Sequence, residues 1–482
     1  MEELEVGFKR LIMNYTRRHS SVVRIGNIEI GGQNPIRVQS MTTTNTNDTE
    51  ACVEQAKRII DAGGELVRLT TQGRREAENL KNISAALKAD GYNTPLVADV
   101  HFNANVADVA ALYAEKVRIN PGNYVDPART FKHLEYTDEE YAAELQKIDD
   151  RLMPFIQICK EHHTAVRLGV NHGSLSDRIM SRYGDTPEGI VESCMEFLRI
   201  FKREQFHDVV ISIKASNTVV MVQTVRLLVK EMDKEDMHYP LHLGVTEAGE
   251  GEDGRIKSAV GIGALLTEGI GDTIRVSLSE EPEAEIPVAK ALVNMIEECA
   301  ALRAEAEASI VDDTITLTVD APDWETLQLK AAMAVGVLLI DRKATKLVLS
   351  SPSLVPSFSL PSGEGWGRDL SSLADAILQA ARIKFTKTEY ISCPGCGRTL
   401  YDLRTTIAHI KEATKEFVGL KIGIMGCIVN GPGEMADADY GYVGAGPGRI
   451  SLYKQKVCVE KNIPEDEAVE KLLELIRTDR ES

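Results

Sequence analysis

The chain has few cysteines, no long apolar run and no excess of positive charge, and each absence excludes a class of protein. Eight cysteines in 482 residues are too few for a disulfide-stabilised secreted scaffold. The longest apolar run, Ala331–Ile340, is far shorter than the ~20 residues that a membrane-spanning helix needs. A net charge of −18 argues against nucleic acid as a general partner, because phosphate-backbone binding needs a basic face. Met1–Ser20 lacks the apolar core of a signal peptide, so we expect a cytoplasmic protein.

Eight short apolar segments, each followed by a helical pattern, recur over the first 300 residues. Strands alternating with helices indicate parallel βα units, and eight such units predict a (β/α)₈ barrel of the TIM type. A doubly wound open sheet is the alternative. The expected strands are Ile36–Met41, Glu65–Thr70, Leu96–Val100, Lys116–Asn120, Ala165–Val170, Val209–Ser216, Leu241–Val245 and Thr273–Leu278.

The pattern changes after residue 301. Residues 302–384 predict a small α/β insert, with strands at Ile315–Val319 and Lys346–Ser350 and helices at Trp324–Leu339 and Leu370–Ile383. The remaining residues carry a cysteine motif, a Gly-rich hairpin candidate and a terminal amphipathic helix, which predict an α+β domain. We therefore divide the chain into a barrel (1–301), an insert (302–384) and a C-terminal domain (385–482).

Five of the expected strands carry a cation near the carboxyl end, on the same face as a short polar residue. Strand residues alternate between faces, and the carboxyl ends of barrel strands form the active site. Burying five cations together would be unfavourable without anions. Guanidinium groups match phosphate geometry, and five cations exceed what one phosphate needs, so a diphosphate ligand is expected. The candidate binding residues are Arg68, Arg118, Asn120, Arg167, Asn171, Lys214, Arg275 and Ser277.

Three more residues at strand ends are candidates for acid–base catalysis. Asp99 and His101 follow the third expected strand, and Glu247 follows the seventh. Within a ring of cations, a carboxylate that does not bind the anion can donate or accept a proton.

Cys393-Pro-Gly-Cys396 and Cys427 offer three thiolates without an obvious fourth. A structural zinc site takes four Cys or His ligands, and iron–sulfur clusters also prefer four thiolates. Glu434 follows Cys427 after a tight Asn-Gly-Pro-Gly turn, so these residues indicate a cluster with one weakly held ligand. Cys458 is the rival fourth ligand. Two other functions stay open: a non-redox phosphate-ester barrel enzyme with structural zinc, and an iron–sulfur sensor of a phosphorylated metabolite.

A series of longer motifs favours a redox enzyme with an iron–sulfur cluster over these two other functions. They are Pro35–Thr42, Leu96–Phe102, Val117–Asn123, Arg167–Asn171, Ile213–Ser216, His242–Gly249, Glu268–Leu278 and both cysteine motifs. In these motifs the chain resembles the 4-hydroxy-3-methylbut-2-en-1-yl diphosphate synthases of the methylerythritol phosphate pathway of isoprenoid biosynthesis. The barrel looks like that of the plant-like members, which carry a large insert, whereas the insert here is short.

The resemblance implies an iron–sulfur oxidoreductase with one [4Fe–4S] cluster per chain, held by Cys393, Cys396, Cys427 and Glu434. The implied reaction reduces 2-C-methyl-D-erythritol 2,4-cyclodiphosphate to (E)-4-hydroxy-3-methylbut-2-enyl diphosphate, with reduced flavodoxin or ferredoxin as donor. Glu247 matches the carboxylate that handles a proton at the departing hydroxyl. A homodimer in which each C-terminal domain caps the partner's barrel is one expected assembly. The insert could instead let a chain cap its own barrel. No chloroplast transit peptide is visible, so a bacterial cytoplasmic enzyme is expected.

Overall fold

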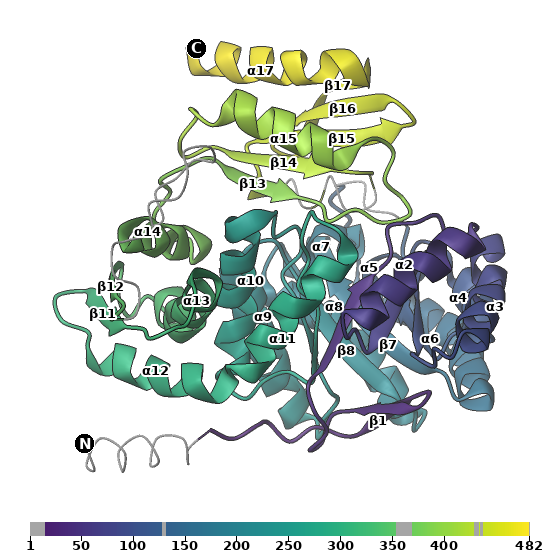
Figure 1. Ribbon diagram of the computed structural model, residues 1–482. Helices are drawn as coiled ribbons and strands as arrows, with labels where there is room; N and C mark the ends of the chain where they lie inside the picture. Colours follow the sequence, from purple (N-terminus) through teal and green to yellow (C-terminus); the bar gives the residue numbers. More distant parts are fainter. Residues whose placement is uncertain (1–14, 128–131, 353–368, 429–432, 434–436, 482) are drawn as a thin grey trace.

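The computed structural model describes residues 15–127, 132–352, 369–428, 433 and 437–481. A barrel forms its centre, the insert lies on one side of the barrel, and the C-terminal sheet lies across the barrel mouth (Figure 1). Among the described residues, no helix has the length and apolar character required to cross a membrane.

Eight parallel strands form the barrel, and all eight expected strands are confirmed. Their hydrogen-bonded order is β8-β7-β6-β5-β4-β3-β10-β9. A parallel bridge between Ile211 and Leu241 joins the two ends of this order, and the Thr246 N–H donates to Ala215 O at 3.2 Å. The closed ring excludes the open sheet. The strands are β3 (Arg37–Met41), β4 (Leu66–Thr71), β5 (Leu96–Val100), β6 (Lys116–Ile119), β7 (Ala165–Asn171), β8 (Val209–Lys214), β9 (His242–Leu243) and β10 (Thr273–Ile274).

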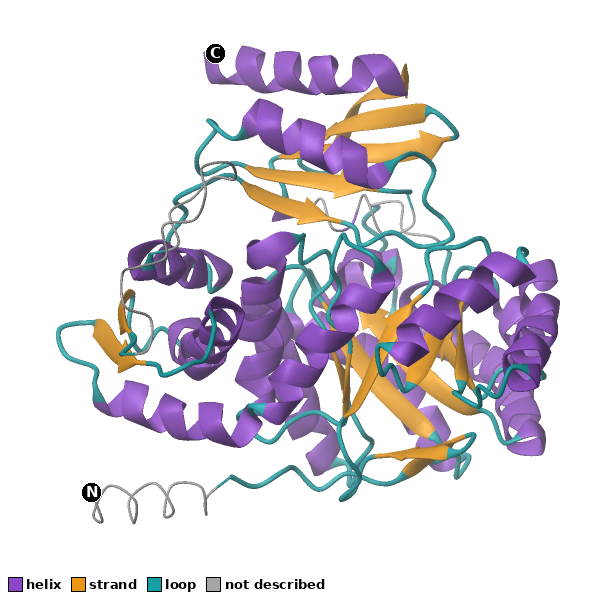
Figure 2. Cartoon of the chain, viewed as in Figure 1, coloured by secondary structure: helices purple, strands orange, loops and turns teal. Residues whose placement is uncertain are grey.

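Helices surround these strands (Figure 2). They are α2 (Thr49–Asp61), α3 (Arg74–Ala89), α4 (Ala104–Ala111), α5 (Pro121–Tyr124), α6 (Asp138–His162), α7 (Asp177–Tyr183), α8 (Pro187–Arg203), α9 (Thr218–Lys234), α10 (Gly251–Leu266) and α11 (Glu285–Asn294). The sequence of α8 illustrates how they form. Thr186 caps its first turn by accepting from the Gly189 N–H, and a proline at the first position has a suitable fixed φ. Apolar residues three and four apart then make one face that is buried against the barrel.

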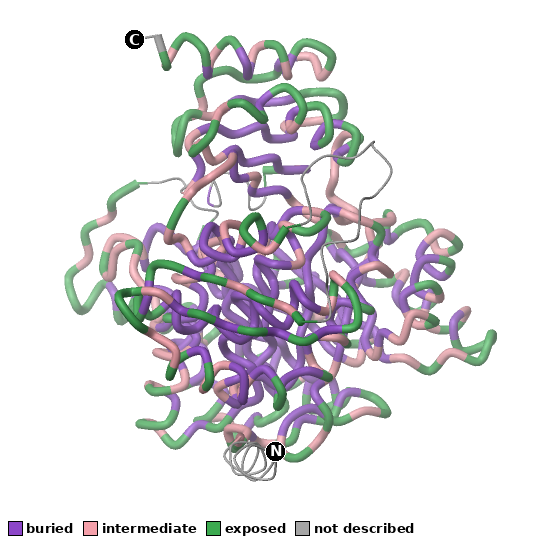
Figure 3. Tube along the Cα trace, turned by 60° about the vertical axis from the view of Figure 1, so that its left-hand side comes forward, coloured by how far each residue is buried: buried purple, intermediate pink, exposed green. Residues whose placement is uncertain are grey.

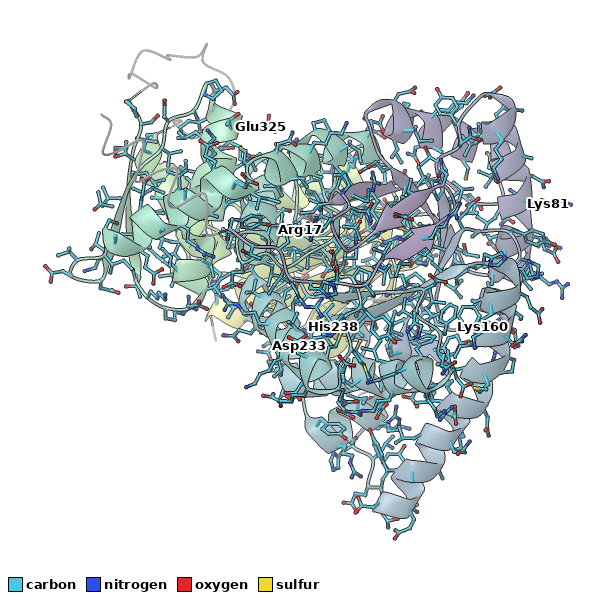
Figure 4. All side chains as sticks on the ribbon, turned by 90° about the horizontal axis from the view of Figure 1, so that it is seen from below. Arg17, Lys81, Lys160, Asp233, His238 and Glu325 are labelled. Atoms are coloured by element: carbon cyan, nitrogen blue, oxygen red, sulfur yellow. The ribbon has the colours of Figure 1, made fainter. Side chains whose placement is uncertain are left out.

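The amino-terminal end of the barrel is closed. The hairpin of β1 (Val23–Ile25) and β2 (Ile28–Ile30) packs its apolar side chains against Leu66, Val97 and Val210, at the starts of three barrel strands. Seen from below, Arg17 lies over the same end (Figure 4), where its NH2 donates to Asp272 Oδ1 at 3.0 Å. Ligands therefore have access from the opposite, carboxyl end.

The insert packs against the barrel. It comprises β11 (Thr314–Thr318), α13 (Trp324–Ile340), β12 (Lys346–Ser350) and α14 (Leu370–Ala380), and α12 (Ile296–Ala308) leads into it across residue 301. Helix α13 is buried along nearly its whole length against α10, and one hydrophobic core runs through the barrel and the insert. Figure 3 shows this continuous buried centre. The insert thus adds a second layer of helices on one side of the barrel.

The C-terminal domain is a five-stranded sheet with two helices on one face. Its strands are β13 (Glu389–Ser392), β14 (Lys421–Met425), β15 (Tyr440–Gly446), β16 (Arg449–Lys454) and β17 (Val457–Pro464), and its helices are α15 (Leu403–Thr414) and α17 (Glu465–Glu481). Leu403, Ile407 and Ile410 of α15 share a core with the sheet. The domain docks on its own barrel, where Ser392 forms a bridge with Ala248 and its Oγ lies 2.9 Å from Ser279 Oγ.

Candidate active site

A cavity lies between the barrel mouth and the C-terminal domain, and all five expected cations line it. The barrel contributes Met41, Arg68, Asp99, His101, Arg118, Arg167, Val170, Asn171, Lys214, Thr246, Glu247, Arg275 and Ser277. The C-terminal domain contributes Cys393, Pro394, Gly395, Cys396 and Arg398. The structure therefore brings the predicted anion site and two of the predicted cluster ligands to one place.

The strand register explains why the cations converge. Asp99, Arg118 and Arg167 are paired neighbours on β5, β6 and β7, and Asn171 is paired with Lys214 on β7 and β8. Side chains paired across parallel strands point to the same face, with the strands about 4.8 Å apart. Here that face is the barrel interior, so the charges meet at the mouth.

Two glycines leave space for these long side chains. A Cβ at Gly169 would lie 2.4 Å from Arg118 Nε, and the Arg118 NH2 group donates to Gly169 O at 2.8 Å. A Cβ at Gly244 would lie 2.4 Å from Lys214 Nζ and 2.8 Å from Arg275 O. Both glycines lie in the expected motifs, and their role here is close approach of a cation to the backbone.

The cations are poorly compensated. Burial, with repulsion from Arg167 and Arg68, holds the pKa of Lys214 well below its usual value. Burial and neighbouring arginines lower the pKa of Arg167 in the same way, and the pKa of Arg68 falls to about 10 although Asp99 partly offsets this. A bound polyanion would remove this penalty.

Arg275 is the exception because it has a dedicated partner. Its Nε and NH2 groups donate to the two carboxylate oxygens of Glu285 at 2.9 and 2.8 Å. Burial alone would lower the pKa of Arg275, but the Glu285 carboxylate outweighs burial and raises it. This bidentate pair fixes the Arg275 guanidinium at the rim of the cavity.

Asp99 and His101 are engaged with arginines. The Asp99 carboxylate accepts from Arg118 NH1 and from Arg398 NH2, both at 3.2 Å. Burial would raise the pKa of Asp99, but Arg68 and Arg118 hold it well below the usual value. Burial and the Arg118 charge lower the pKa of His101 to about 3, and Arg118 NH1 contacts His101 Nε2. At neutral pH the pair is therefore an anion beside a neutral imidazole.

Glu247 has a different environment. It is buried, its backbone φ is 49°, and its Oε2 atom has no hydrogen-bond partner within the described structure. Burial raises the pKa of Glu247, with opposing effects from Thr246, Lys214 and Lys257. A non-glycine residue in the left-handed region is uncommon and is often found at functional sites.

The short polar residues of the predicted ring differ in position. Asn171 and Ser277 line the cavity. The structure does not bring Asn120 there: its Nδ2 donates to Ser174 Oγ at 2.7 Å, and its Oδ1 accepts from the Gly122 N–H at 3.2 Å. Asn120 caps the short helix α5, so both polar atoms of its side chain have partners outside the cavity.

The cysteine motifs follow adjacent parallel strands. Cys393 directly follows β13 and Cys427 lies two residues after β14, and the Cys393 N–H donates to Ile424 O at 3.0 Å. The Gly395 N–H donates to Cys393 Sγ at 3.3 Å. Carboxyl ends of parallel neighbours share one sheet edge, so three cysteines reach the same edge of the sheet. Backbone N–H groups directed at a cysteine sulfur are a feature of iron–sulfur sites.

Glu434 lies outside the described residues, whereas Cys458 can be placed. Cys458 belongs to β17, and β15 and β16 separate it from β14. At about 4.8 Å per strand, it lies about 14 Å from β14 across the sheet. It also pairs with Tyr453, near the end of β16, whereas the cysteine loops face the opposite end. Cys458 is therefore remote from the other three cysteines.

Among the described Cys, His, Asp and Glu side chains, no group of three that could hold one metal ion is found. Thiolates are the donors that an iron–sulfur cluster takes, and hydrogen bonds to their sulfurs are a feature of such sites. Three cysteines at one sheet edge, with a backbone N–H donated to the Cys393 sulfur, are compatible with a cluster.

Met41 and Arg398 are among the residues that line the cavity but were not candidates from the sequence. Met41 Sδ accepts from Arg68 Nε at 3.0 Å and from Arg275 NH1 at 3.7 Å. Arg398, two residues after Cys396, reaches Asp99 across the domain boundary. Its position two residues after Cys396 is the feature of the sequence that could have indicated its role.

Comparisons with known proteins agree with this geometry. The family described as "GcpE TIM-barrel domain" matches residues 20–290, and "GcpE protein C-terminal domain" matches residues 389–478. Relatives named "4-hydroxy-3-methylbut-2-en-1-yl diphosphate synthase (flavodoxin)" include one from Bacteroides fragilis, 53% identical over 97% of this chain and 96% of the relative. Another, from Porphyromonas gingivalis, is 44% identical over 97% and 98%. The Bacteroides alignment has 613 positions against 482 residues here, so the relative has residues that this chain lacks.

The solved structures found are much less similar to this chain than these relatives are. A sialic acid synthetase from Leptospira borgpetersenii has a TM-score of 0.37 and 12% identity, covering 59% of this chain and 91% of that one. The family matches and the identities over nearly the full chain are decisive. The chain belongs to the GcpE family of 4-hydroxy-3-methylbut-2-en-1-yl diphosphate synthases.

Proposed function

We propose that this protein reduces 2-C-methyl-D-erythritol 2,4-cyclodiphosphate to (E)-4-hydroxy-3-methylbut-2-enyl diphosphate, as the names of its relatives suggest. Two electrons and one proton are consumed. The carbon–oxygen bond to the cyclic diphosphate and the carbon–hydroxyl bond break, a carbon–carbon double bond forms, and water leaves. The observation that carries the proposal is one cavity lined by five barrel cations and by two cysteines of the opposing domain.

The barrel cations bind and orient the diphosphate. Arg68, Arg118, Arg167, Lys214 and Arg275 would surround it from five strands, with Asn171 and Ser277 as neutral hydrogen-bonding groups. Because the cations are buried and fixed before the ligand arrives, they also stabilise the negative charge that develops on the released diphosphate. The C-terminal domain covers the mouth and excludes water.

Glu247 is the proposed proton donor to the departing hydroxyl. It lines the cavity, and burial favours its protonated form. Asp99 and His101, expected as catalytic groups, have contacts that favour another role, since arginines occupy the Asp99 carboxylate and contact the imidazole. We assign both to positioning of Arg118.

The cofactor that fits the cysteine loops is a [4Fe–4S] cluster, with Cys393, Cys396 and Cys427 as ligands and Glu434 as the proposed fourth. When bound, it would supply one-electron transfer. The relatives' names specify flavodoxin, and we propose reduced flavodoxin as the donor. The relatives are bacterial, and we propose a cytoplasmic reaction.

The C-terminal domain is joined to the barrel of its own chain beside the cavity. Lys257 of α10 pairs with Glu389 of β13 at 3.0 Å across the domain boundary. We therefore propose that each barrel is capped by its own C-terminal domain, with or without dimer formation.

Anaerobic turnover of the cyclic diphosphate, with reduced flavodoxin or a chemical reductant, tests the proposal. Wild-type protein should contain iron and sulfide and form the allylic diphosphate. Cys393→Ser should lose the cluster's visible absorbance and all turnover. Cys458→Ser, the matched control, should keep both. Zinc in place of iron and sulfide, or turnover by a cluster-free Cys393→Ser variant, would refute the redox function.

A further inference from the structure

Arg398 is the one cavity cation that comes from the C-terminal domain in the described structure. It follows the cysteine motif, its side chain is 8% exposed, and it lines the cavity together with the barrel cations. Its position therefore depends on how the two domains dock, which distinguishes it from arginines fixed by barrel strands.

Asp99 is shared between Arg398 and the barrel. Its Oδ2 accepts from Arg398 NH2 and its Oδ1 from Arg118 NH1, each at 3.2 Å. One carboxylate charge thus faces two guanidinium groups, and Asp99 is 1% exposed. Asp99 acts as a resident anion that holds the domains together and leaves a surplus of positive charge beside it.

One donor atom of Arg398 has no hydrogen-bond partner in the described structure. This atom, NH1, is buried. An unpaired buried donor on a charged group is unfavourable. Phosphate oxygens are suitable acceptors, because a guanidinium group presents two parallel N–H bonds to them.

We propose that Arg398 is a diphosphate-binding residue supplied by the C-terminal domain, and that Asp99 is the anion with which the diphosphate competes. The proposal rests on the proposed function and adds a consequence. Because Arg398 belongs to the domain that carries the cysteines, a diphosphate bound by Arg398 and Arg118 joins that domain to the barrel. Closure over the substrate is then coupled to recognition of its diphosphate.

Calorimetric titration of the anaerobic holoenzyme with inorganic pyrophosphate tests this. Arg398→Gln should weaken binding about 10- to 100-fold, as expected for one lost charge-assisted contact. Arg398→Lys, which keeps the charge without the fork, should lie between. Asp99→Asn keeps one side-chain oxygen as an acceptor for the arginines but removes the charge of the resident anion, so this variant should bind pyrophosphate several-fold more tightly. Arg404→Gln is the matched control: Arg404 also joins the C-terminal domain to the barrel, through Glu281, but is half exposed and does not line the cavity.

Each result has a clear consequence. If Arg398→Gln binds pyrophosphate as Arg404→Gln does, Arg398 does not bind the diphosphate. Weaker binding by Asp99→Asn would overturn the role of Asp99 as a competing anion. Loss of iron from Arg398→Gln would assign Arg398 to the cluster and also overturn the proposal. If wild type itself does not bind pyrophosphate, the anion site of the proposed function fails together with this inference.

Discussion

Replacing Lys214 by methionine should make the ligand-free protein more stable while weakening its affinity for diphosphate. Lys214 is 5% exposed, and burial together with Arg167 and Arg68 lowers its pKa far below 10.5. For an assumed separation of about 6 Å, two like charges repel by about 3 kcal/mol at an effective dielectric constant of about 20. Methionine has a similar length and no charge, so we expect a gain of about 2–3 kcal/mol in the free energy of unfolding.

The lowered pKa of Lys214 determines how the stability difference between variant and wild type should change with pH. A lysine whose pKa is lowered by folding destabilises the protein fully below its folded pKa, and the destabilisation disappears as the pH approaches the unfolded value of 10.5. The stability advantage of Lys214→Met should therefore be largest at low pH and should narrow toward pH 10. Glu285 partly offsets the lowering but does not reverse it.

Thermal unfolding, followed by circular dichroism at several pH values, measures the effect. With an unfolding entropy of about 2.1 cal/mol/K per residue, 2–3 kcal/mol corresponds to a rise in Tm of about 2–3 °C. Pyrophosphate at 100 times the wild-type Kd should stabilise the wild type by about 2.7 kcal/mol and the variant much less, so that the advantage of the variant largely disappears. Lys81→Met is the control, because Lys81 is exposed on α3 (Figure 4) and should show no such gap. A Lys214→Met variant no more stable than wild type at neutral pH would refute the reasoning.

Two further predictions concern a glycine at the cavity and a buried ion-pair network elsewhere in the barrel domain. Gly244→Ala should displace Lys214 and press on Arg275 O, weakening pyrophosphate binding at least tenfold; unchanged affinity by calorimetry would contradict the close-approach role. Arg178→Gln should lower the free energy of unfolding by about 3–5 kcal/mol, because Arg178 donates to Asp126 and Glu196 while 2% exposed. Urea unfolding would measure it, and a loss under 1 kcal/mol would show that the network contributes little.

The barrel and its ring of cations could be predicted from the sequence because both follow from local periodicity. Alternation along a strand fixes which side chains share a face, and the carboxyl ends of parallel strands meet at one mouth. Arg118 and Arg167 were therefore expected to be neighbours, and they are paired in register. Asn120 obeys the same alternation, but the next residues start a helix and its side chain caps that helix instead. Helix capping is a local competitor that strand periodicity does not reveal.

Other features depend on contacts between distant segments. Glu434 was the expected fourth ligand and Cys458 stayed open as its rival, since distance along the chain says nothing of strand order in a mixed sheet. Only the order β14-β15-β16-β17 separates Cys458 from Cys427. Likewise, Arg398 meets Asp99 across 299 positions of sequence, and no periodicity within either domain links the two.

A negatively charged protein can contain a cationic cavity because the few carboxylates near the cavity do not neutralise all of its cations. Glu285 forms an ion pair with one cation, Arg275, whereas Asp99 is shared by two arginines. The other cations that line the cavity have no carboxylate ion-pair partner among the described residues. The protein thus fixes one guanidinium permanently and leaves the rest undercompensated. In the proposed function, a cyclic diphosphate would supply the missing negative charge at the place where the cysteine loops approach. A neutral sugar of the same shape would leave those cations unpaired, so selectivity for the diphosphate follows from the energetic cost of the empty site.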